Sequence, residues 1–349
     1  MPSSLRDVAR KAKVSTGTVS NVLNRPEIVA PETLARVRRV IDELKFVPNG
    51  FARHLRSGQS RTIGLIIPDI ANPFYTEVAR GVEDAANRRD YAVFLCISDS
   101  NIAKEENYIG VLLEQRVRGV LIAPTDDAHK SVELLRSHHV GVALLDHKSE
   151  RSQECSVSVD HVRGGEIAIQ HLVDLGHKEI VWVTGSEDYR QCVDRGKGVA
   201  NITESAGIDL TTITLKVLNS NYGEEAARQI MAMEKRPTAI FCANDMLAFA
   251  VMRELMRLEV KVPEDISLIG YDDIYFAPTA AVPLSSIFQP AYQLGFRAAE
   301  LLISECEDTG EHQHKQVIFE PQLVARSSTA DVSFMRPSSP LRIMEEISA

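Results

Sequence analysis

The first fifty residues carry apolar positions at the spacing of short helices. One predicted helical face has apolar residues at i, i+3, i+4 and i+7, namely Leu5, Val8, Ala9 and Ala12. Ser4 and Asp7 precede and enter this helix with the spacing of a capping box. A second helix is predicted from about Ser15, and a third from Pro31 to about Leu44. Three short helices with a tight turn between the first two are typical of a helix-turn-helix.

The second of these helices has an unusual outer face. Val19, Val22 and Leu23 give it an apolar side. The opposite side carries short, uncharged groups rather than Lys and Glu, namely Thr16, Gly17, Thr18 and Asn21. Such a face is suited to hydrogen bonding with a partner, whereas a helix that only meets solvent is usually charged.

From Thr62 the pattern changes to short apolar strands that alternate with amphipathic helices. A first set of strands is predicted in TIGLIIPD, YAVFLCIS, GVLIAP and GVALLD, with helices at about 73–89, 105–116 and 130–138. A second set is predicted in EIVWVTG, ITLKVLN, TAIFCAN and ISLIGYD, with helices at about 163–174, 195–206, 223–234 and 245–258. This order predicts two α/β lobes, each a doubly wound parallel sheet, with ligands bound beyond the carboxyl ends of the strands.

Two segments interrupt these patterns. Residues 46–62 form a polar linker in which a short helix is expected at about 49–57, and Leu55 has no predicted core nearby to bury it. Residues 329–349 combine Pro, Ser and mixed charge, so we expect a loosely ordered tail. The predicted domains are therefore 1–60, containing the helix-turn-helix at about 4–47, and a two-lobed body at 61–328.

Charge separates the two predicted domains further. The chain has a net charge of −9, yet residues 1–61 contain 12 Lys and Arg against 5 Asp and Glu. A basic head on an acidic body favours nucleic acid as the partner of the head. No apolar run approaches the length of a membrane helix, the N-terminus lacks the apolar core of a signal peptide, and the five cysteines are scattered singly. We expect a cytoplasmic protein without membrane contact, disulfides or a zinc cluster.

Motifs along residues 4–328 resemble the LacI/GalR family of bacterial transcription regulators. The matching motifs, in order, are LRDVARKAKVSTGTVSNVLN, VPNGFARHLRSGQSRTIGLIIPDIANPFY, HLVDLGHKEI, AIFCANDMLA, VPEDISLIGYDD and SIFQP. The resemblance implies a helix-turn-helix head, a hinge helix and a body like a periplasmic sugar-binding protein. It also implies a homodimer that binds double-stranded operator DNA under the control of a small-molecule effector, with no cofactor.

The resemblance places DNA contacts on the second helix and on the hinge. In this family the second helix enters the major groove and the hinge meets the minor groove. The residues at the matching positions are Ser15, Thr16, Gly17, Thr18, Ser20, Asn21, Asn24, Arg53, Leu55 and Arg56. Leu55 would be the wedge between base steps. Gly17 offers no side chain at a reading position, and Asn21, where the family usually has Arg, favours adenine over guanine.

The body resembles the ribose-binding type of periplasmic protein and the ribose repressors. A bound sugar needs aromatic faces and polar groups that pair its hydroxyls. The residues at the matching positions are Phe74, Tyr75, Asp146, Arg195, Tyr222, Asn244, Asp272 and Gln289. The preferred effector is a ribose, related pentose or nucleoside. His147 departs from the family pattern after Asp146, so a purine or another metabolite acting as corepressor remains the alternative.

Other classes of protein fit less well. A transport-associated sugar-binding protein would have an export signal and no basic head, whereas this chain has the opposite features. No P-loop, GxSxG, HExxH or complete GxGxxG motif indicates an enzyme. EHQHK at 311–315 could attract a metal, but an exposed polar loop is the preferred interpretation. Too few apolar residues lie in the tail for a tetramerisation helix.

Overall fold

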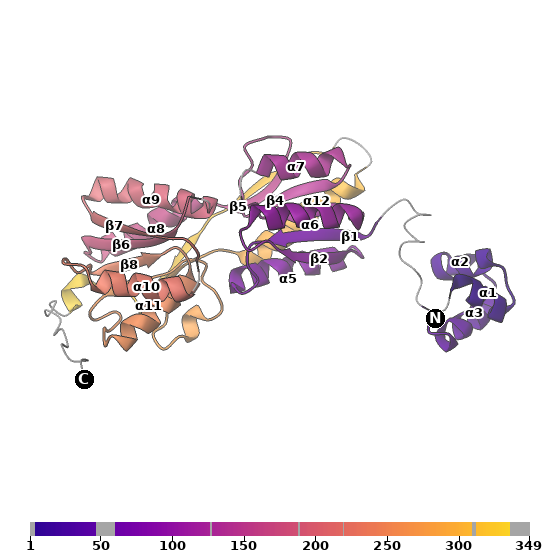
Figure 1. Cartoon of the computed structure of the whole chain (residues 1–349), viewed down its shortest axis with the longest axis horizontal. Helices are drawn as coiled ribbons and strands as arrows, with labels where there is room; N and C mark the ends of the chain where they lie inside the picture. The colour runs from indigo at the N-terminus through magenta and orange to yellow at the C-terminus, as the bar shows by residue number, and fades with distance from the viewer. Residues whose placement is uncertain are drawn as a thin grey trace. The chain divides into compact units, whose positions relative to one another are not determined.

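A computed structural model describes residues 4–46, 60–125, 128–187, 189–218, 220–308 and 312–335. The chain divides into two compact units, Met1–Ser60 and Arg61–Ala349 (Figure 1). No helix in the described ranges is long and apolar enough to cross a membrane.

The head is a three-helix unit, as predicted. Its helices are α1 (Leu5–Ala12), α2 (Thr16–Asn24) and α3 (Pro31–Glu43), with a 3-10 turn at Pro26–Ile28. Ser4 Oγ accepts a hydrogen bond from the backbone N–H of Asp7 at 3.3 Å, and the Asp7 carboxylate accepts one from the backbone N–H of Ser4 at 2.9 Å. Lys13 ends α1 in a left-handed conformation. The three helices bury a small apolar core, which contains Val8, Ala12, Val19, Val22, Val37 and Val40.

The first lobe of the body is a parallel six-stranded sheet in the order β11-β5-β4-β3-β1-β2. Its strands are β1 (Thr62–Ile67), β2 (Ala92–Ile97), β3 (Gly119–Ile122), β4 (Gly141–Leu145), β5 (Cys155–Val159) and β11 (Gln316–Phe319). Its helices are α5 (Pro73–Asn87), α6 (Ile102–Glu114), α7 (Ala128–Ser137) and α12 (Ala291–Glu307). Alternate strand residues pack on α5 and α12 on one face, and on α6 and α7 on the other. The lobe is therefore doubly wound, as predicted.

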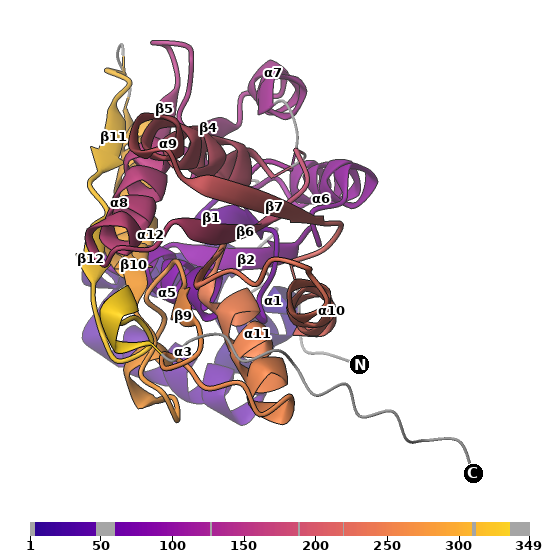
Figure 2. The ribbon, with the colours of Figure 1, turned by 90° about the vertical axis from the view of Figure 1, so that its left-hand side faces the viewer.

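The second lobe has a parallel four-stranded sheet in the order β7-β6-β8-β9. Its strands are β6 (Glu179–Gly185), β7 (Asp209–Leu215), β8 (Ala239–Cys242) and β9 (Ser267–Ile269). Its helices are α8 (His161–Asp174), α9 (Arg190–Ala206), α10 (Ser220–Met231) and α11 (Asp245–Arg257). Helices α8 and α9 pack together, and so do α10 and α11 (Figure 2). The sheet and these helices enclose one buried apolar cluster.

The chain passes between the lobes three times. It leaves the first lobe after β5, returns between β10 (Ser286–Phe288) and α12, and leaves again between β11 and β12 (Gln322–Val324). The sequence pattern predicted the two lobes as consecutive sets, and no element was predicted at β5, α12 or β11. The predicted start of α9, residue 195, lies five residues after its start in the structure.

The first part of the predicted tail belongs to the second lobe. The Val332 N–H donates to the Leu175 carbonyl at 2.9 Å, and the Ala330 carbonyl lies 3.0 Å from His177 Nε2. The prediction of a loosely ordered tail is therefore wrong for residues 329–335, because backbone groups of that segment are satisfied by the body. Residues 336–349 lie outside the described ranges.

Glycine permits a very close approach of helices α8 and α9. A Cβ atom on Gly198 would overlap the carbonyl oxygen of Val162, and one on Gly165 would overlap that of Arg195. Backbone cannot move aside as a flexible side chain can, so the spacing of this helix pair requires both glycines.

We therefore expect Gly198→Ala to lower the free energy of unfolding by roughly 1–3 kcal/mol, because the added methyl group overpacks the helix contact. Gly110→Ala is the matched control: Gly110 lies on the exposed face of α6 with no atom near its would-be Cβ. There the better helix propensity of Ala should raise stability by roughly 0.5–1 kcal/mol. Urea unfolding of the three proteins measures both values, and equal stability of the two variants would contradict the packing argument.

Candidate ligand-binding cleft and nucleic-acid interface

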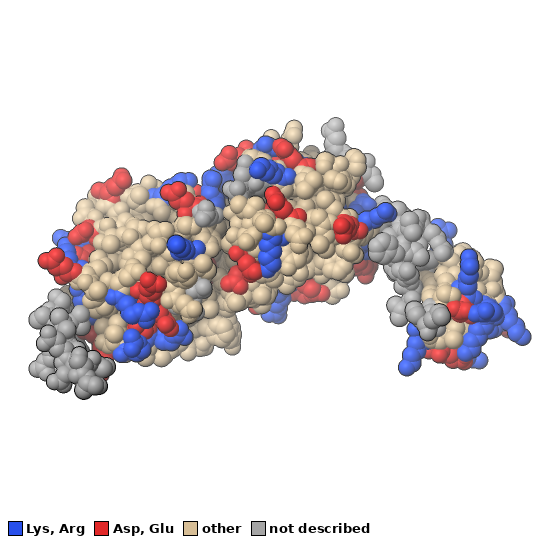
Figure 3. Space-filling model, viewed as in Figure 1, with Lys and Arg blue, Asp and Glu red and all other residues tan. Residues whose placement is uncertain are grey.

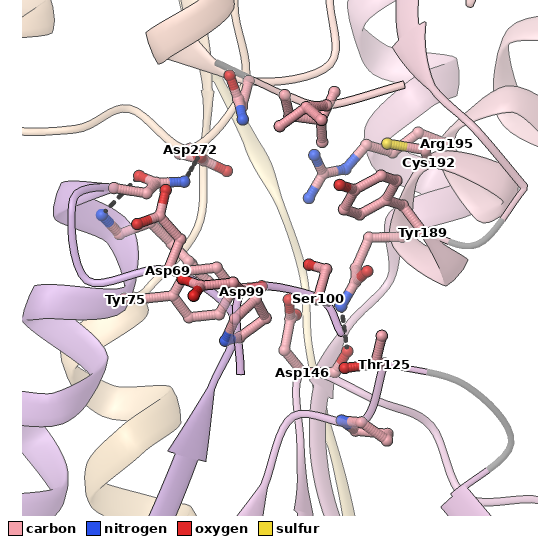
Figure 4. Close-up of a pocket in the computed structure, with 18 residues that line it drawn as sticks. Asp69, Tyr75, Asp99, Ser100, Thr125, Asp146, Tyr189, Cys192, Arg195 and Asp272 are labelled. Carbon is pink, nitrogen blue, oxygen red and sulfur yellow. Dashed lines mark hydrogen bonds between the residues drawn. The ribbon is translucent and has the colours of Figure 1, made fainter. Parts of the chain in front are cut away.

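A cleft of about 260 Å³ lies between the lobes, at the carboxyl ends of their strands. The first lobe contributes Pro68, Asp69, Asn72, Phe74, Tyr75, Asp99, Ser100, Pro124, Thr125 and Asp146. The second lobe contributes Tyr189, Gln191, Cys192, Arg195, Val217, Leu218, Asn244 and Asp272. Figure 4 shows Tyr75 and Asp146 of the first lobe facing Tyr189 and Arg195 of the second. Apolar rings and polar groups therefore converge from both sides.

Asp146 connects the two lobes. It follows β4, has a left-handed backbone with φ of 51°, and is 3% exposed. Its Oδ1 lies 3.0 Å from Nε2 of His161, the first residue of α8. Its Oδ2 accepts a hydrogen bond from Gln191 Nε2 at 3.2 Å. One first-lobe carboxylate therefore holds two elements of the second lobe.

Arg195 is a buried cation at the second-lobe side of the cleft. Its side chain packs with the guanidinium carbon 3.7 Å from the centre of the Tyr271 ring, and Nη1 donates to the Ala243 carbonyl. Its Nε lies 3.4 Å from His161 Nδ1, which makes Nδ1 the acceptor and leaves Nε2–H to donate to Asp146. Within the described part of the chain, no carboxylate forms an ion pair with Arg195. A buried cation without a carboxylate partner can bind a polar ligand strongly.

Asp272 is the second buried carboxylate of the cleft. It follows β9 with φ of 110° and is 5% exposed. It accepts hydrogen bonds from Gln289 Nε2 at 2.7 Å and from Asn72 Nδ2, across the lobes, at 3.5 Å. Burial raises the pKa of Asp272 to about 7, although Arg195 and these two amides act in the opposite direction.

Helix N-caps place further cleft residues. Asn72 Oδ1 accepts from the Phe74 N–H at 3.0 Å and starts α5, and this brings Phe74 and Tyr75 to the cleft with their rings edge to face at 5.0 Å. Asn244 caps α11 in the same way, accepting from the Leu247 N–H at 2.8 Å. Its amide nitrogen stays available to the cleft. The aromatic pair and this amide are therefore positioned by local backbone geometry.

Six of the eight predicted effector residues line the cleft: Phe74, Tyr75, Asp146, Arg195, Asn244 and Asp272. The other two do not. Gln289 lies behind Asp272 and is 1% exposed, and Tyr222 packs against the apolar core of the second lobe. His147 also does not line the cleft.

Sequence reasoning missed several cleft residues. Asn72 precedes Pro73, which is the signal of an N-cap, and could have been found from that pattern. Thr125 has a buried hydroxyl with no hydrogen-bond partner among the described residues. Tyr189 and Gln191 sit at the start of α9, where the sequence analysis predicted no helix. His161 and Tyr271, which support Arg195 and Asp146, carry no local signal.

The predicted reading face of α2 is open to solvent in the head. Thr16, Gly17 and Asn21 are exposed, while Thr18 and Ser20 are half-buried. Ser15 caps the helix, accepting from the Thr18 N–H at 3.0 Å, and its hydroxyl lies 2.9 Å from that of Thr18. Lys and Arg side chains predominate on the face of the head shown in Figure 3. Asn24 is the last residue of α2, and Arg53, Leu55 and Arg56 lie outside the described residues.

Comparison with known proteins agrees with this arrangement. The family model "Bacterial regulatory proteins, lacI family" matches residues 4–49, and the model "Periplasmic binding protein-like domain" matches residues 169–329. The HTH-type transcriptional repressor PurR of Photobacterium profundum is 35% identical over 338 residues, covering 95% of this chain and 100% of the relative. PurR of Vibrio campbellii is 36% identical over 331 residues, covering 93% and 98%.

Solved structures share the same fold. The lac repressor dimer bound to operator and the anti-inducer ONPF matches with a TM-score of 0.82 and 26% identity, covering 95% of this chain and 100% of that one. A LacI family transcriptional regulator from Enterococcus faecium with bound ribose matches with a TM-score of 0.72 and 28% identity, covering 78% and 99%. The chain therefore belongs to the lacI family of bacterial regulatory proteins, and it is a DNA-binding transcriptional repressor rather than an enzyme.

Proposed function

We propose that a neutral small molecule of the ribose, nucleoside or purine class binds the cleft and sets the affinity of this repressor for its operator. The observation that carries the proposal is Arg195, a buried guanidinium in the cleft whose partners are a carbonyl, an imidazole and an aromatic face. Asp146 and Asp272 flank it from the two lobes. Hydroxyl or ring N–H groups of a ligand can pair with such donors and acceptors at once.

The charges of the cleft favour a neutral ligand. One arginine, Arg195, faces four aspartates: Asp146 and Asp272 are buried, and Asp69 and Asp99 are exposed. A phosphorylated ligand would bring negative charge toward these carboxylates, whereas a sugar or purine hydroxyl or amine can donate to them. Phe74 and Tyr75 offer flat apolar faces to a ring.

Two ligand classes remain within this proposal. The ribose-bound regulator from Enterococcus faecium, at 28% identity, supports a pentose. The PurR relatives, at 35% and 36% identity, support the purine alternative and are the more similar proteins. We therefore place the purine alternative first. A corepressor strengthens operator binding and an inducer weakens it, so the sign of the response distinguishes the purine class from the pentose class.

The lobe contacts suggest how a ligand acts. Asp146 binds His161 and Gln191 across the cleft, and Asp272 binds Asn72. A ligand that uses the same carboxylates changes the free energy of this lobe arrangement relative to a more open one. The resulting shift in population reaches DNA through the linker, and by reciprocity the operator changes ligand affinity by the same factor.

We expect Arg195→Lys to weaken ligand binding by about 10–100-fold, because lysine keeps the charge but loses the planar contact with Tyr271 and the forked donors. Calorimetric titration with ribose, purine nucleosides and purine bases measures the loss. Lys197→Ala is the control on the same helix, since Lys197 is exposed and pairs with Asp194. If the wild-type protein binds none of these compounds, the ligand proposal is overturned. If Arg195→Lys binds a ligand with unchanged affinity, Arg195 is not one of the residues that bind the ligand.

The raised pKa of Asp272 also predicts a pH dependence of stability. The folded protein keeps a proton on Asp272 up to about pH 7, whereas the unfolded chain releases it near pH 4. The unfolded state thus binds fewer protons in this window, so the free energy of unfolding falls as pH rises from about 4 to 7. In Asp272→Asn this fall in the free energy of unfolding between about pH 4 and 7 should be smaller by an amount on the order of 1–4 kcal/mol.

Urea unfolding at several pH values measures this slope. Asp90→Asn is the control, because the side chain of Asp90 is 91% exposed, and it should retain the wild-type slope. Burial and the nearby Asp272 carboxylate both raise the pKa of Asp245, so Asp272→Asn also reduces the part of the slope that Asp245 contributes, whereas Asp90→Asn leaves it unchanged. If Asp272→Asn and wild type lose stability in parallel, Asp272 is ionised throughout.

We propose further that two chains bind one operator. The edge strand β2 exposes two large apolar side chains, Phe94 at 45% and Leu95 at 44%. Such an edge favours pairing with a second copy. In each head, the exposed Thr16 and Asn21 would meet base edges, with basic residues of the head near phosphates.

We expect Asn21→Arg to change which operators are preferred, because asparagine pairs with adenine and arginine with guanine. Binding to a randomised duplex library at fixed salt measures the preference. Ala35→Arg is the control: it adds the same charge to an exposed position of α3 and should strengthen binding without changing the preference. An unchanged preference in Asn21→Arg would show that Asn21 does not contact base edges. Saturation of the duplex at one bound chain would contradict the proposal that two chains bind one operator.

A further inference from the structure

Four side chains with metal-binding atoms meet in the first lobe, away from the ligand cleft. They are Cys155, Glu305, His312 and His314, and one ligand atom of each lies within 4.8 Å of those of the others. The Cys155 Sγ atom is 3.2 Å from His312 Nε2 and 3.6 Å from His314 Nδ1. None of the four lines the cleft between the lobes.

Three separate elements bring these side chains together. Cys155 is the first residue of β5, and Glu305 lies in the last turn of α12. His312 and His314 precede β11, which pairs in parallel with β5. Gln313 between them is exposed, so the backbone alternation points both imidazoles to the same side. An exposed polar loop was the preferred prediction for this segment, yet the His312 side chain is only 12% exposed.

The polar atoms of this cluster are incompletely paired by protein. Glu305 Oε2 is buried and has no hydrogen-bond partner among the described residues. The Cys155 Sγ atom lies beside both imidazole nitrogens, so the sulfur and the two rings face one common point. The two rings stand edge to face at 5.0 Å. One cation at the centre would satisfy the carboxylate oxygen, the sulfur and both nitrogens at once.

We propose that Cys155, Glu305, His312 and His314 bind one Zn²⁺ ion in a four-coordinate site. Sulfur and imidazole ligands exclude Mg²⁺ and Ca²⁺, which take oxygen, and a mixed S, N and O set suits Zn²⁺. Zinc bonds of about 2.0–2.3 Å imply tetrahedral ligand separations of about 3.3–3.8 Å, close to the two distances from Sγ. Binding converts the thiol to a thiolate and releases its proton to the buffer.

Four protein ligands leave no open position, which is typical of a structural zinc site. The ion ties the start of β5 and the residues before β11 to the end of α12, all within the first lobe. It therefore stabilises the first lobe and does not depend on which effector fills the cleft. A failure of this proposal would leave the proposed function untouched.

The test uses the full chain, reduced and stripped of metal with a chelator, and titrated with Co²⁺. We expect saturation at one Co²⁺ per chain, with an intense near-ultraviolet thiolate-to-cobalt band and visible bands of a tetrahedral site, all abolished by one equivalent of Zn²⁺. Cys155→Ser should lose the thiolate band. His314→Ala should lose stoichiometric binding, whereas His138→Ala, which removes an exposed histidine of the same lobe, should titrate as wild type.

Thermal unfolding of the wild type and the variants, with and without Zn²⁺, distinguishes the loss of a metal ligand from a folding defect. One equivalent of Zn²⁺ should raise the melting temperature of wild type and His138→Ala but not that of His314→Ala. If Cys155→Ser fails to fold, the partly exposed His314 still provides the decisive variant. Absence of a thiolate-to-cobalt band in wild type, or equal Co²⁺ binding by His314→Ala and wild type, would overturn the proposal.

Discussion

Burial of the Arg195 guanidinium is the constraint on which the body of this repressor depends. A cation taken out of water is costly unless its surroundings replace the lost hydration. Here the replacement comes from the face of Tyr271, the Ala243 carbonyl and the imidazole of His161. Two adjacent glycines of α8 make room for this arrangement: a Cβ on Gly164 would overlap the Tyr271 hydroxyl, and one on Gly165 would overlap the Arg195 backbone.

The same network connects the arginine to lobe position. His161 contacts Arg195 through Nδ1 and Asp146 of the other lobe through Nε2, so the cation fixes the imidazole tautomer that holds the lobes together. Asp272 forms a second contact across the lobes, and burial raises its pKa. The polar atoms that can bind a ligand therefore also hold the two lobes together, so ligand binding in the cleft directly changes the relative stability of lobe arrangements. The proposed zinc site lies elsewhere in the first lobe and affects its rigidity instead.

Local sequence signals were sufficient for the head and for much of the cleft. The capping box at Ser4, the cap at Ser15 and the helical spacing of the apolar residues gave the three helices. Asp146, Asn244 and Asp272 were assigned from the resemblance to the family, and each also follows a predicted apolar strand, where parallel strands end at one edge. Gln289 also follows a strand, yet it is buried behind Asp272, to which its Nε2 donates a hydrogen bond.

The sequence by itself determined the head and the two α/β lobes, because caps, apolar period and strand ends are read within a few neighbouring residues. Its motifs identified the family, and the resemblance placed six of the eight proposed residues in the cleft. Only the tertiary structure decided that α12 and β11 return to the first lobe and that His161 and Tyr271 support Arg195. It also brought Cys155 beside His312, which lies 157 residues further along the chain. Such contacts depend on how distant elements pack, and no local pattern of residues encodes that geometry.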